Sequence, residues 1–121
     1  MLNFERLAVY QKAIELADRV YTMTRAWSSP QMRSLTDQLR RAALSIALNI
    51  AEGSGRTKRD FRNFLRTSRA SCYECLAILE VARRQQQIPT SEHGQYRAWC
   101  IELTRMISGL MNSLSKEGVI S

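Results

Sequence analysis

Apolar residues recur every three or four positions along most of this 121-residue chain, the spacing of helices that bury one face. The first stripe predicts a helix over residues 7–27. Three further stripes predict helices over residues 35–54, 58–87 and 91–114, and a polar tail follows over residues 115–121. The pattern therefore predicts four helices that account for nearly the whole chain.

Capping and breaking residues support these boundaries. Ser34 is the predicted N-cap of the second helix, and Asp37 stands where it completes a capping box. Thr57 is the predicted cap of the third helix, with Asp60 in the reciprocal position. Pro89 is expected to stop the third helix, because the residue before a proline is driven out of helical geometry.

The fold class that follows is all-α, an antiparallel up-down-up-down four-helix bundle with no sheet. No alternating run of β-branched residues is bounded by turn residues, and short connections make successive helices antiparallel. With 45% apolar residues, residues 1–121 suffice for one core and are expected to form a single domain. Four residues of the third and fourth helices are expected in that core: Cys75, Leu79, Leu103 and Ile107.

The second helix carries apolar residues on two sides. One stripe is the expected core face, and a second, roughly opposite, consists of Leu44, Ala47, Leu48 and Ala51. A four-helix bundle buries only one face of each helix, so the second stripe predicts a contact with another copy of the chain. The alternative is that the leucines are simply exposed, as scattered apolar residues often are.

Positive charge is concentrated in the middle of the chain. Eighteen Lys and Arg against eleven Asp and Glu give a net charge of +7, and residues 33–69 hold nine of the basic residues against three acids. On the third predicted helix, an arc of about 80° at about 100° per residue collects Arg59, Arg62, Arg66, Arg69 and Tyr73. Guanidinium groups in a row suit a polyanion, although an Arg-rich solvated face is the plain alternative.

Four more basic residues extend this prediction. Arg56 and Lys58 are expected to assist from the preceding turn, whereas Arg40 and Arg41 are weaker candidates that face either nucleic acid or a neighbouring subunit. Tyr73 is placed to stack on an unpaired base. We expect RNA or DNA binding with little sequence specificity, because the chain has no readable groove-docking motif.

Catalytic and metal-binding patterns are weak. Cys72 and Cys75 form a C-x-x-C on an apolar helix face with no second cysteine pair, so they are expected to be core residues. His93 is the only histidine, which excludes a di-iron bundle with paired Glu-x-x-His motifs. Residues 53–58 lack the strand and the glycine spacing of a phosphate loop. The sequence predicts no enzyme, no metal and no cofactor.

The expected location is the cytoplasm. The N-terminus lacks an apolar run of signal-peptide length, and the most continuous apolar segment, residues 42–51, is about half the length that spans a bilayer. Three cysteines at core positions fit a compartment that keeps thiols reduced.

Three segments carry a family resemblance. They are residues 45–53 (SIALNIAEG) after Arg40 to Ala43, residues 4–13 (FERLAVYQKA), and the run from Asp60 to Glu74. Over about residues 4–114 the chain resembles the bacterial four-helix-bundle proteins encoded in intervening sequences of 23S ribosomal RNA genes. It is also similar to the accessory variability determinant of diversity-generating retroelements, a basic pentameric ring that binds nucleic acid and works with a reverse transcriptase.

The resemblance implies a homopentamer with an RNA or DNA role. One departure is visible, because many relatives have Pro where this chain has Ala47, and the second helix is therefore expected to be straighter here. The alternative function is a scaffold or accessory subunit whose basic face docks an acidic protein partner such as a reverse transcriptase.

Overall fold

The structure is a computed structural model that describes residues 2–117. The prediction of an all-α four-helix fold is confirmed, and the described residues contain no β-strand. Two short 3-10 turns, η1 (Asn3–Arg6) and η2 (Pro30–Met32), precede the first and second α-helices. The four α-helices are α1 (Ala8–Thr24), α2 (Arg33–Ser54), α3 (Lys58–Arg84) and α4 (Thr90–Glu117).

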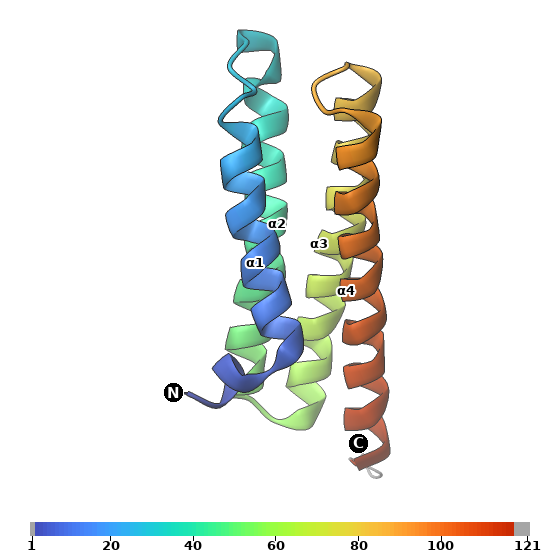
Figure 1. The fold of residues 1–121 in the computed structure, drawn as a ribbon. Helices are drawn as coiled ribbons and strands as arrows, with labels where there is room; N and C mark the ends of the chain where they lie inside the picture. Colours follow the sequence, from blue (N-terminus) through green and yellow to red (C-terminus); the bar gives the residue numbers. More distant parts are fainter. Residues whose placement is uncertain (1, 118–121) are drawn as a thin grey trace.

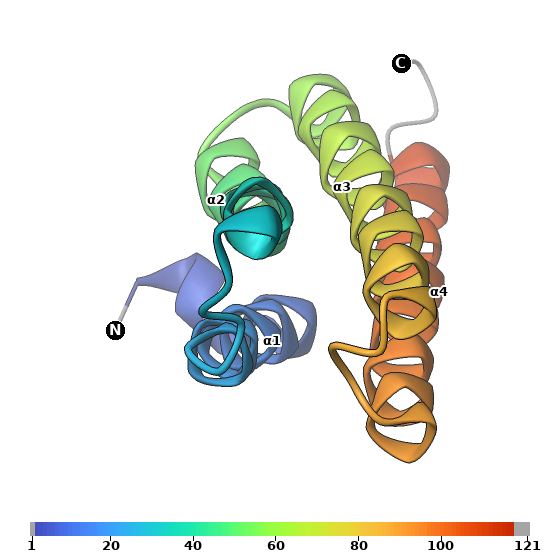
Figure 2. The ribbon, with the colours of Figure 1, turned by 90° about the horizontal axis from the view of Figure 1, so that it is seen from above.

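Successive helices run in opposite directions, so the chain passes up, down, up and down the bundle (Figure 1). Seen from above, α1 and α2 form one pair and α3 and α4 form another, with α2 beside α3 (Figure 2). The packing of α2 on α3 is the most extensive of the bundle, and that of α1 on α4 is the slightest of the four neighbouring pairs. The α2–α3 seam is therefore the main contact between the two pairs.

The apolar stripes converge on one core, as expected. Cys75, Leu79, Leu103 and Ile107 are all buried, which confirms the predicted core positions of α3 and α4. Each of the four helices contributes at least one side chain that solvent does not reach: Leu16, Leu39, Ile46, Ile50, Leu65, Leu103 and Ile107. Full burial of a Leu or Ile side chain stabilises the fold by roughly 1.5–3 kcal/mol.

Small polar side chains join α2 to α3. The Ser68 hydroxyl donates to the Ile46 carbonyl at 2.9 Å, and the Ser71 hydroxyl donates to the Ser45 hydroxyl at 3.0 Å. Ser68 is fully buried, so its hydrogen bond also satisfies a group that would otherwise be costly inside the core. These short side chains let the two helices approach closely.

The two helices also approach closely at Gly53, in the last turn of α2. A Cβ atom at this position would stand 2.6 Å from Cβ of Phe64 and 2.9 Å from Cδ1 of Phe61. The Cβ of Phe64 is fixed to the backbone of α3, so it cannot move aside without shifting that helix. Position 53, one residue before the end of α2, therefore has room only for glycine.

The predicted start of α2 is wrong. The helix begins at Arg33 with Met32 at the N-cap, so Ser34 lies inside the first turn and does not form a capping box with Asp37. The reason is that Pro30 starts the η2 turn, which runs directly into α2, and proline is favoured at such first positions. The Thr57 cap is confirmed, because its hydroxyl accepts from the Asp60 amide at 3.2 Å.

Three other helix ends differ from their predictions. α1 ends at Thr24, although Trp27 beyond it is still in the core. α3 ends at Arg84 because Gln86 takes a left-handed φ of 60°, and the Gln87 amide closes the turn on the Ala82 carbonyl at 2.9 Å. α4 continues to Glu117 into the predicted polar tail, of which residues 118–121 lie outside the described residues.

A cluster of charged groups surrounds Glu80 near this turn. Arg83 donates to the carboxylate from Nε and Nη2 at 2.9 and 2.7 Å, and Arg84 donates from Nε at 2.9 Å. The hydrogen bonds from Arg83 and then Arg84 lower the pKa of Glu80 to about 2. His93, a buried residue of α4, places Nε2 at 3.6 Å from the same carboxylate.

Gly53→Ala is expected to destabilise the protein by about 1–3 kcal/mol, because the added methyl group overpacks the α2–α3 seam. Gly109→Ala is the matched control. It lies on an exposed face of α4 with nothing within 4 Å of its Cβ position, so it should stabilise the helix by up to about 1 kcal/mol. Urea denaturation measures both, and equal effects would contradict the close approach at Gly53.

Glu80→Gln is expected to lower the melting temperature at pH 7. The pKa of Glu80 is depressed in the folded state from an ordinary value of 4.5 to about 2, so the charged form stabilises the fold above the ordinary value. That contribution is lost as the pH falls toward 2. The difference in melting temperature between wild type and variant should therefore shrink from pH 5 to pH 2, and a constant difference would rule out the ion-pair explanation.

Candidate nucleic-acid interface

The α3 basic surface, defined as Arg59, Arg62, Arg66, Arg69 and Tyr73, forms part of the exterior of the bundle. Arg59 and Arg66 are exposed, and Tyr73 is 53% exposed. These three side chains form its outer row because they are more exposed than Arg62 and Arg69. The outer row is therefore available to a ligand without any rearrangement of the bundle.

The other two arginines form an inner row toward α4. Arg69 is half-buried and donates from Nη1 to the Ser108 hydroxyl at 3.0 Å. Arg62 is also half-buried, and its Nε is enclosed without a hydrogen-bond partner among the described residues. Sequence reasoning missed the role of Ser108, because its separation of 39 residues from Arg69 gives no local signal. The arginine row is therefore only partly free.

Among the described residues, no ion pair joins these four arginines to a carboxylate. Arg66 instead donates to the side-chain oxygen of Asn63. The C-terminal end of α3 is different, because Arg83 and Arg84 both pair with Glu80. The charge of these four arginines is thus not paired with a carboxylate among the described residues, whereas that of Arg83 and Arg84 is. A polyanion would be attracted to the four arginines that lack a carboxylate partner.

Two further basic residues lie at the turn before α3 and at the start of that helix, and Arg56 already interacts with neighbouring side chains. Arg56 pairs with Glu52 at 3.3 Å and lies over the Phe64 ring at 5.4 Å. Lys58 is the exposed first residue of α3, on the end of the helix that also carries Arg59. Arg56 is accordingly held in place by its neighbours, and its charge is paired with that of Glu52.

Arg40 does not lie with the α3 basic surface. Its Nε donates to the Thr24 hydroxyl at 2.8 Å, its Nη2 reaches the Tyr21 carbonyl at 3.4 Å, and the guanidinium lies 4.7 Å from the Tyr21 ring centroid. It therefore joins α2 to α1. Arg41 is exposed beside Leu44 on the outer face of α2.

That outer face of α2 carries an apolar patch. Leu44 is 36% exposed and Leu48 is 56% exposed, and both line a shallow hollow of about 370 Å³ that also includes Arg41, Asn49 and Glu52. Asn49 is held by its Nδ2, which donates to the Ser45 carbonyl at 2.8 Å. The two leucines are thus available to a second copy of the chain.

Ala47 and Ala51 differ from the two leucines. Ala51 is half-buried, and Ala47 is fully buried within this one chain. Ala47 lies on the edge of the core stripe, where neighbouring helices of the same chain cover a small side chain completely. The predicted interface position of Ala47 is therefore corrected to the core.

The cysteines are buried and free: Cys72, Cys75 and Cys100. Burial raises the pKa of the Cys72 thiol to about 12, and a hydrogen bond with Cys100 together with burial raises that of Cys75. Thiols in this state are poor nucleophiles. Within residues 2–117 no three His, Cys, Asp or Glu side chains are grouped to hold a metal ion.

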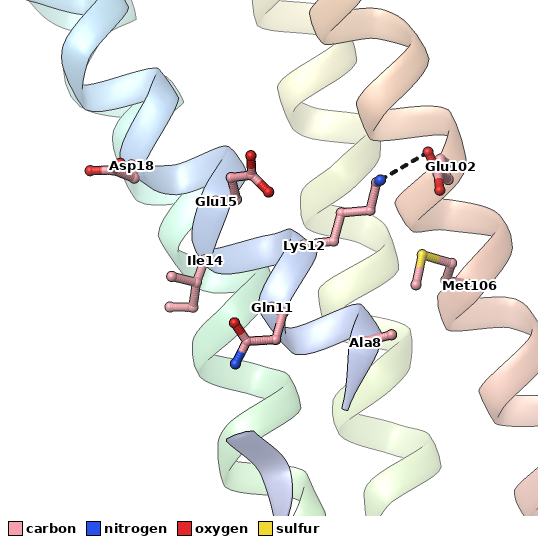
Figure 3. A pocket seen from close by; sticks show the side chains of 8 residues that line it. All are labelled: Ala8, Gln11, Lys12, Ile14, Glu15, Asp18, Glu102 and Met106. Atoms are coloured by element: carbon pink, nitrogen blue, oxygen red, sulfur yellow. Dashed lines mark ion pairs between the residues drawn. The ribbon is translucent and has the colours of Figure 1, made fainter. Parts of the chain in front are cut away.

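A hollow of about 760 Å³ lies between α1 and α4. Lys12 reaches across it to Glu102, with 3.1 Å between Nζ and Oε2, while Glu15 and Asp18 extend from α1 (Figure 3). Three carboxylates against one ammonium make this hollow acidic, so it does not suit a polyanion. It also lacks a paired nucleophile and base.

Comparisons with known proteins place this fold. A crystal structure of a protein of unknown function from the S23 ribosomal protein family of Bacteroides thetaiotaomicron is similar, with a TM-score of 0.80 and 22% identity over 86% of this chain and 98% of that one. A search of curated proteins gave no match. None of the described helices has the length and apolar character needed to cross a membrane.

The sequence itself matches one protein family over residues 5–109, which include α1, α2, α3 and most of α4. The match covers most of the chain and agrees with the fold of the similar crystal structure. The chain belongs to the 23S rRNA-intervening sequence protein family.

Proposed function

We propose that this chain is a non-catalytic, cytoplasmic nucleic-acid-binding protein that works as a homo-oligomer. In this proposal the α3 basic surface contacts the phosphate backbone, with RNA as the first ligand to consider because of the family's name. The observation that carries the proposal is the row of four α3 arginines without a carboxylate partner among the described residues.

Electrostatics supports this proposal. Each guanidinium that meets a phosphate forms forked hydrogen bonds and releases condensed counterions. Arg59 and Arg66 are exposed, so their binding to phosphate requires no loss of packing. Arg62 and Arg69 stand behind them and add positive potential, and Arg69 keeps donors beyond the one that it gives to Ser108.

Tyr73 extends the surface beyond charge. Its ring is 53% exposed in the same row as Arg59 and Arg66, so an unpaired base has access to its face. Stacking on an aromatic side chain contributes about 1–3 kcal/mol per base and tolerates any sequence. Together with backbone contacts, this favours single-stranded or looped nucleic acid with little sequence readout.

Oligomerisation would strengthen weak contacts. The exposed pair Leu44 and Leu48 supports a contact between copies of the chain, and five copies, suggested by resemblance alone, would carry about +35 from a net charge of +7 each. Surfaces repeated on neighbouring subunits would then bind one nucleic acid multivalently.

Reversing the two exposed arginines, Arg59→Glu with Arg66→Glu, is expected to weaken binding of a structured RNA about tenfold or more at moderate salt. Two lost phosphate contacts should also flatten the slope of log affinity against log salt by nearly two. The melting temperature should change little, because the charges are exposed. Fluorescence anisotropy at several salt concentrations measures the affinity and the slope.

The control for that variant is Arg6→Glu with Arg19→Glu, which makes the same change of charge at exposed positions near α1. It should retain most of the affinity. Unchanged binding in the α3 variant would overturn the proposal. Preferential loss of binding to an acidic polypeptide would instead favour the scaffold function, with a protein such as a reverse transcriptase as the partner.

The double substitution Leu44→Glu with Leu48→Glu is expected to dissociate the oligomer while leaving helicity intact, because two carboxylates without partners are costly inside an interface. Sedimentation velocity measures the assembly. Ile14→Glu with Val81→Glu is the control, since these residues are 38% and 44% exposed on other helices. A monomeric wild type would exclude the homo-oligomer, and an unchanged assembly would exclude this face.

A further inference from the structure

A second basic site lies where α1 ends and α2 begins. A hollow of about 240 Å³ there is lined in part by three arginines and four hydroxyl-bearing residues: Arg25, Arg33, Arg40, Thr24, Ser28, Ser29 and Thr36. In Figure 1 this end of the molecule is opposite the turn between α2 and α3. The 22 residues of α2 separate the two ends by roughly 33 Å at about 1.5 Å per residue.

One face of a continuous helical segment forms most of the hollow. The η2 turn runs directly into α2, so Ser29, Arg33, Thr36 and Arg40 recur at helical spacing on one side. Ser29 is in the extended conformation of an N-cap, yet its hydroxyl makes no capping hydrogen bond.

Thr36 is the second, independent indication of a ligand. Its side chain is only 8% exposed, and its Oγ1 has no hydrogen-bond partner among the described residues. A threonine hydroxyl inside a helix ordinarily bonds to a carbonyl one turn earlier, as Thr24 does to Val20 at 2.8 Å. A buried hydroxyl without a partner costs about 1–3 kcal/mol, so a group that accepts its hydrogen bond would remove a penalty.

The charges around the hollow favour an anion. Within the described part of the chain, no ion pair or hydrogen bond engages the Arg25 or Arg33 guanidinium. Arg40 is held by Thr24 and the Tyr21 carbonyl through Nε and Nη2, which leaves Nη1 uncommitted. Asp37 also lines the hollow and opposes an anion, but three guanidinium groups outweigh one carboxylate.

We propose that this hollow binds a phosphate group, held by Arg25, Arg33 and Arg40 and by the hydroxyl of Thr36. A tetrahedral oxyanion accepts hydrogen bonds from several directions, which matches donors arriving from α1, from the connection and from α2. The phosphate is either a terminal or free monoester or an internal phosphodiester of a nucleic acid. The proposal does not depend on the α3 basic surface.

Inorganic phosphate is the first probe, titrated into the full-length wild type at constant ionic strength against a chloride control. The expected result is saturable binding, with amide shifts in two-dimensional NMR spectra that concentrate over residues 28–40. Thr36→Val and Arg33→Gln should each weaken binding about tenfold or more, the effect of losing one hydrogen bond to a charged group. Arg33 is exposed, so its variant decides the matter if Thr36→Val does not fold.

Two control variants isolate the site. Arg6→Gln removes an exposed charge elsewhere and should bind phosphate like the wild type. Arg59→Glu with Arg66→Glu should also retain phosphate binding, which separates this proposal from the α3 basic surface. Absence of saturable binding, or binding that Thr36→Val and Arg33→Gln leave unchanged, would overturn the proposal.

A pair of oligonucleotides identifies the source of the phosphate. The same short sequence with and without a 5′-phosphate competes against inorganic phosphate in the Arg59→Glu, Arg66→Glu background. Competition only by the phosphorylated form assigns the site to terminal monoesters, and equal competition assigns it to the backbone. Failure of both forms to compete with bound inorganic phosphate assigns the site to free phosphate.

Discussion

At the α2–α3 seam, the two helical backbones approach so closely that position 53 has no room for a side chain, since its Cβ would lie 2.6 Å from that of Phe64. The hydroxyls of Ser68 and Ser71 add hydrogen bonds across the same seam. This contact is the main one between the α1–α2 pair and the α3–α4 pair, so it fixes how the outer faces of α2 and α3 are presented. The relative positions of the two candidate surfaces therefore depend on the packing of α2 against α3.

The sequence predicted the four helices and the core because both depend on periodic burial, which is written locally along the chain. Helix ends were harder to predict, because each depends on the backbone conformation of one or two residues. Gln86 takes a left-handed φ of 60° that usually marks glycine, so the sequence indicated an end near Pro89 and not at Arg84. Ser34 has the chemistry of a cap, but Pro30 had already started the helical segment.

The candidate site was predictable only as an arc on an isolated helix. A helical wheel groups Arg59 with Arg69, yet α4 covers one edge of that arc and gives Arg69 a partner in Ser108. The same limitation affected Ala47. The helical wheel groups it with exposed leucines, but in the bundle it is completely buried. Periodicity gives the direction of a side chain, whereas its neighbours across the bundle come from tertiary packing.

Arginines in this chain differ most in what they already bind. Arg83 is committed to Glu80, and removing its charge would alter the fold before it altered a ligand. Arg59 has no such partner among the described residues, so it can bind a phosphate without breaking an interaction within the fold. Arg40 is in between, because Thr24 orients it while one nitrogen is left over. An arginine oriented by neutral oxygens keeps its full charge, and a preorganised charge loses less entropy when a ligand binds.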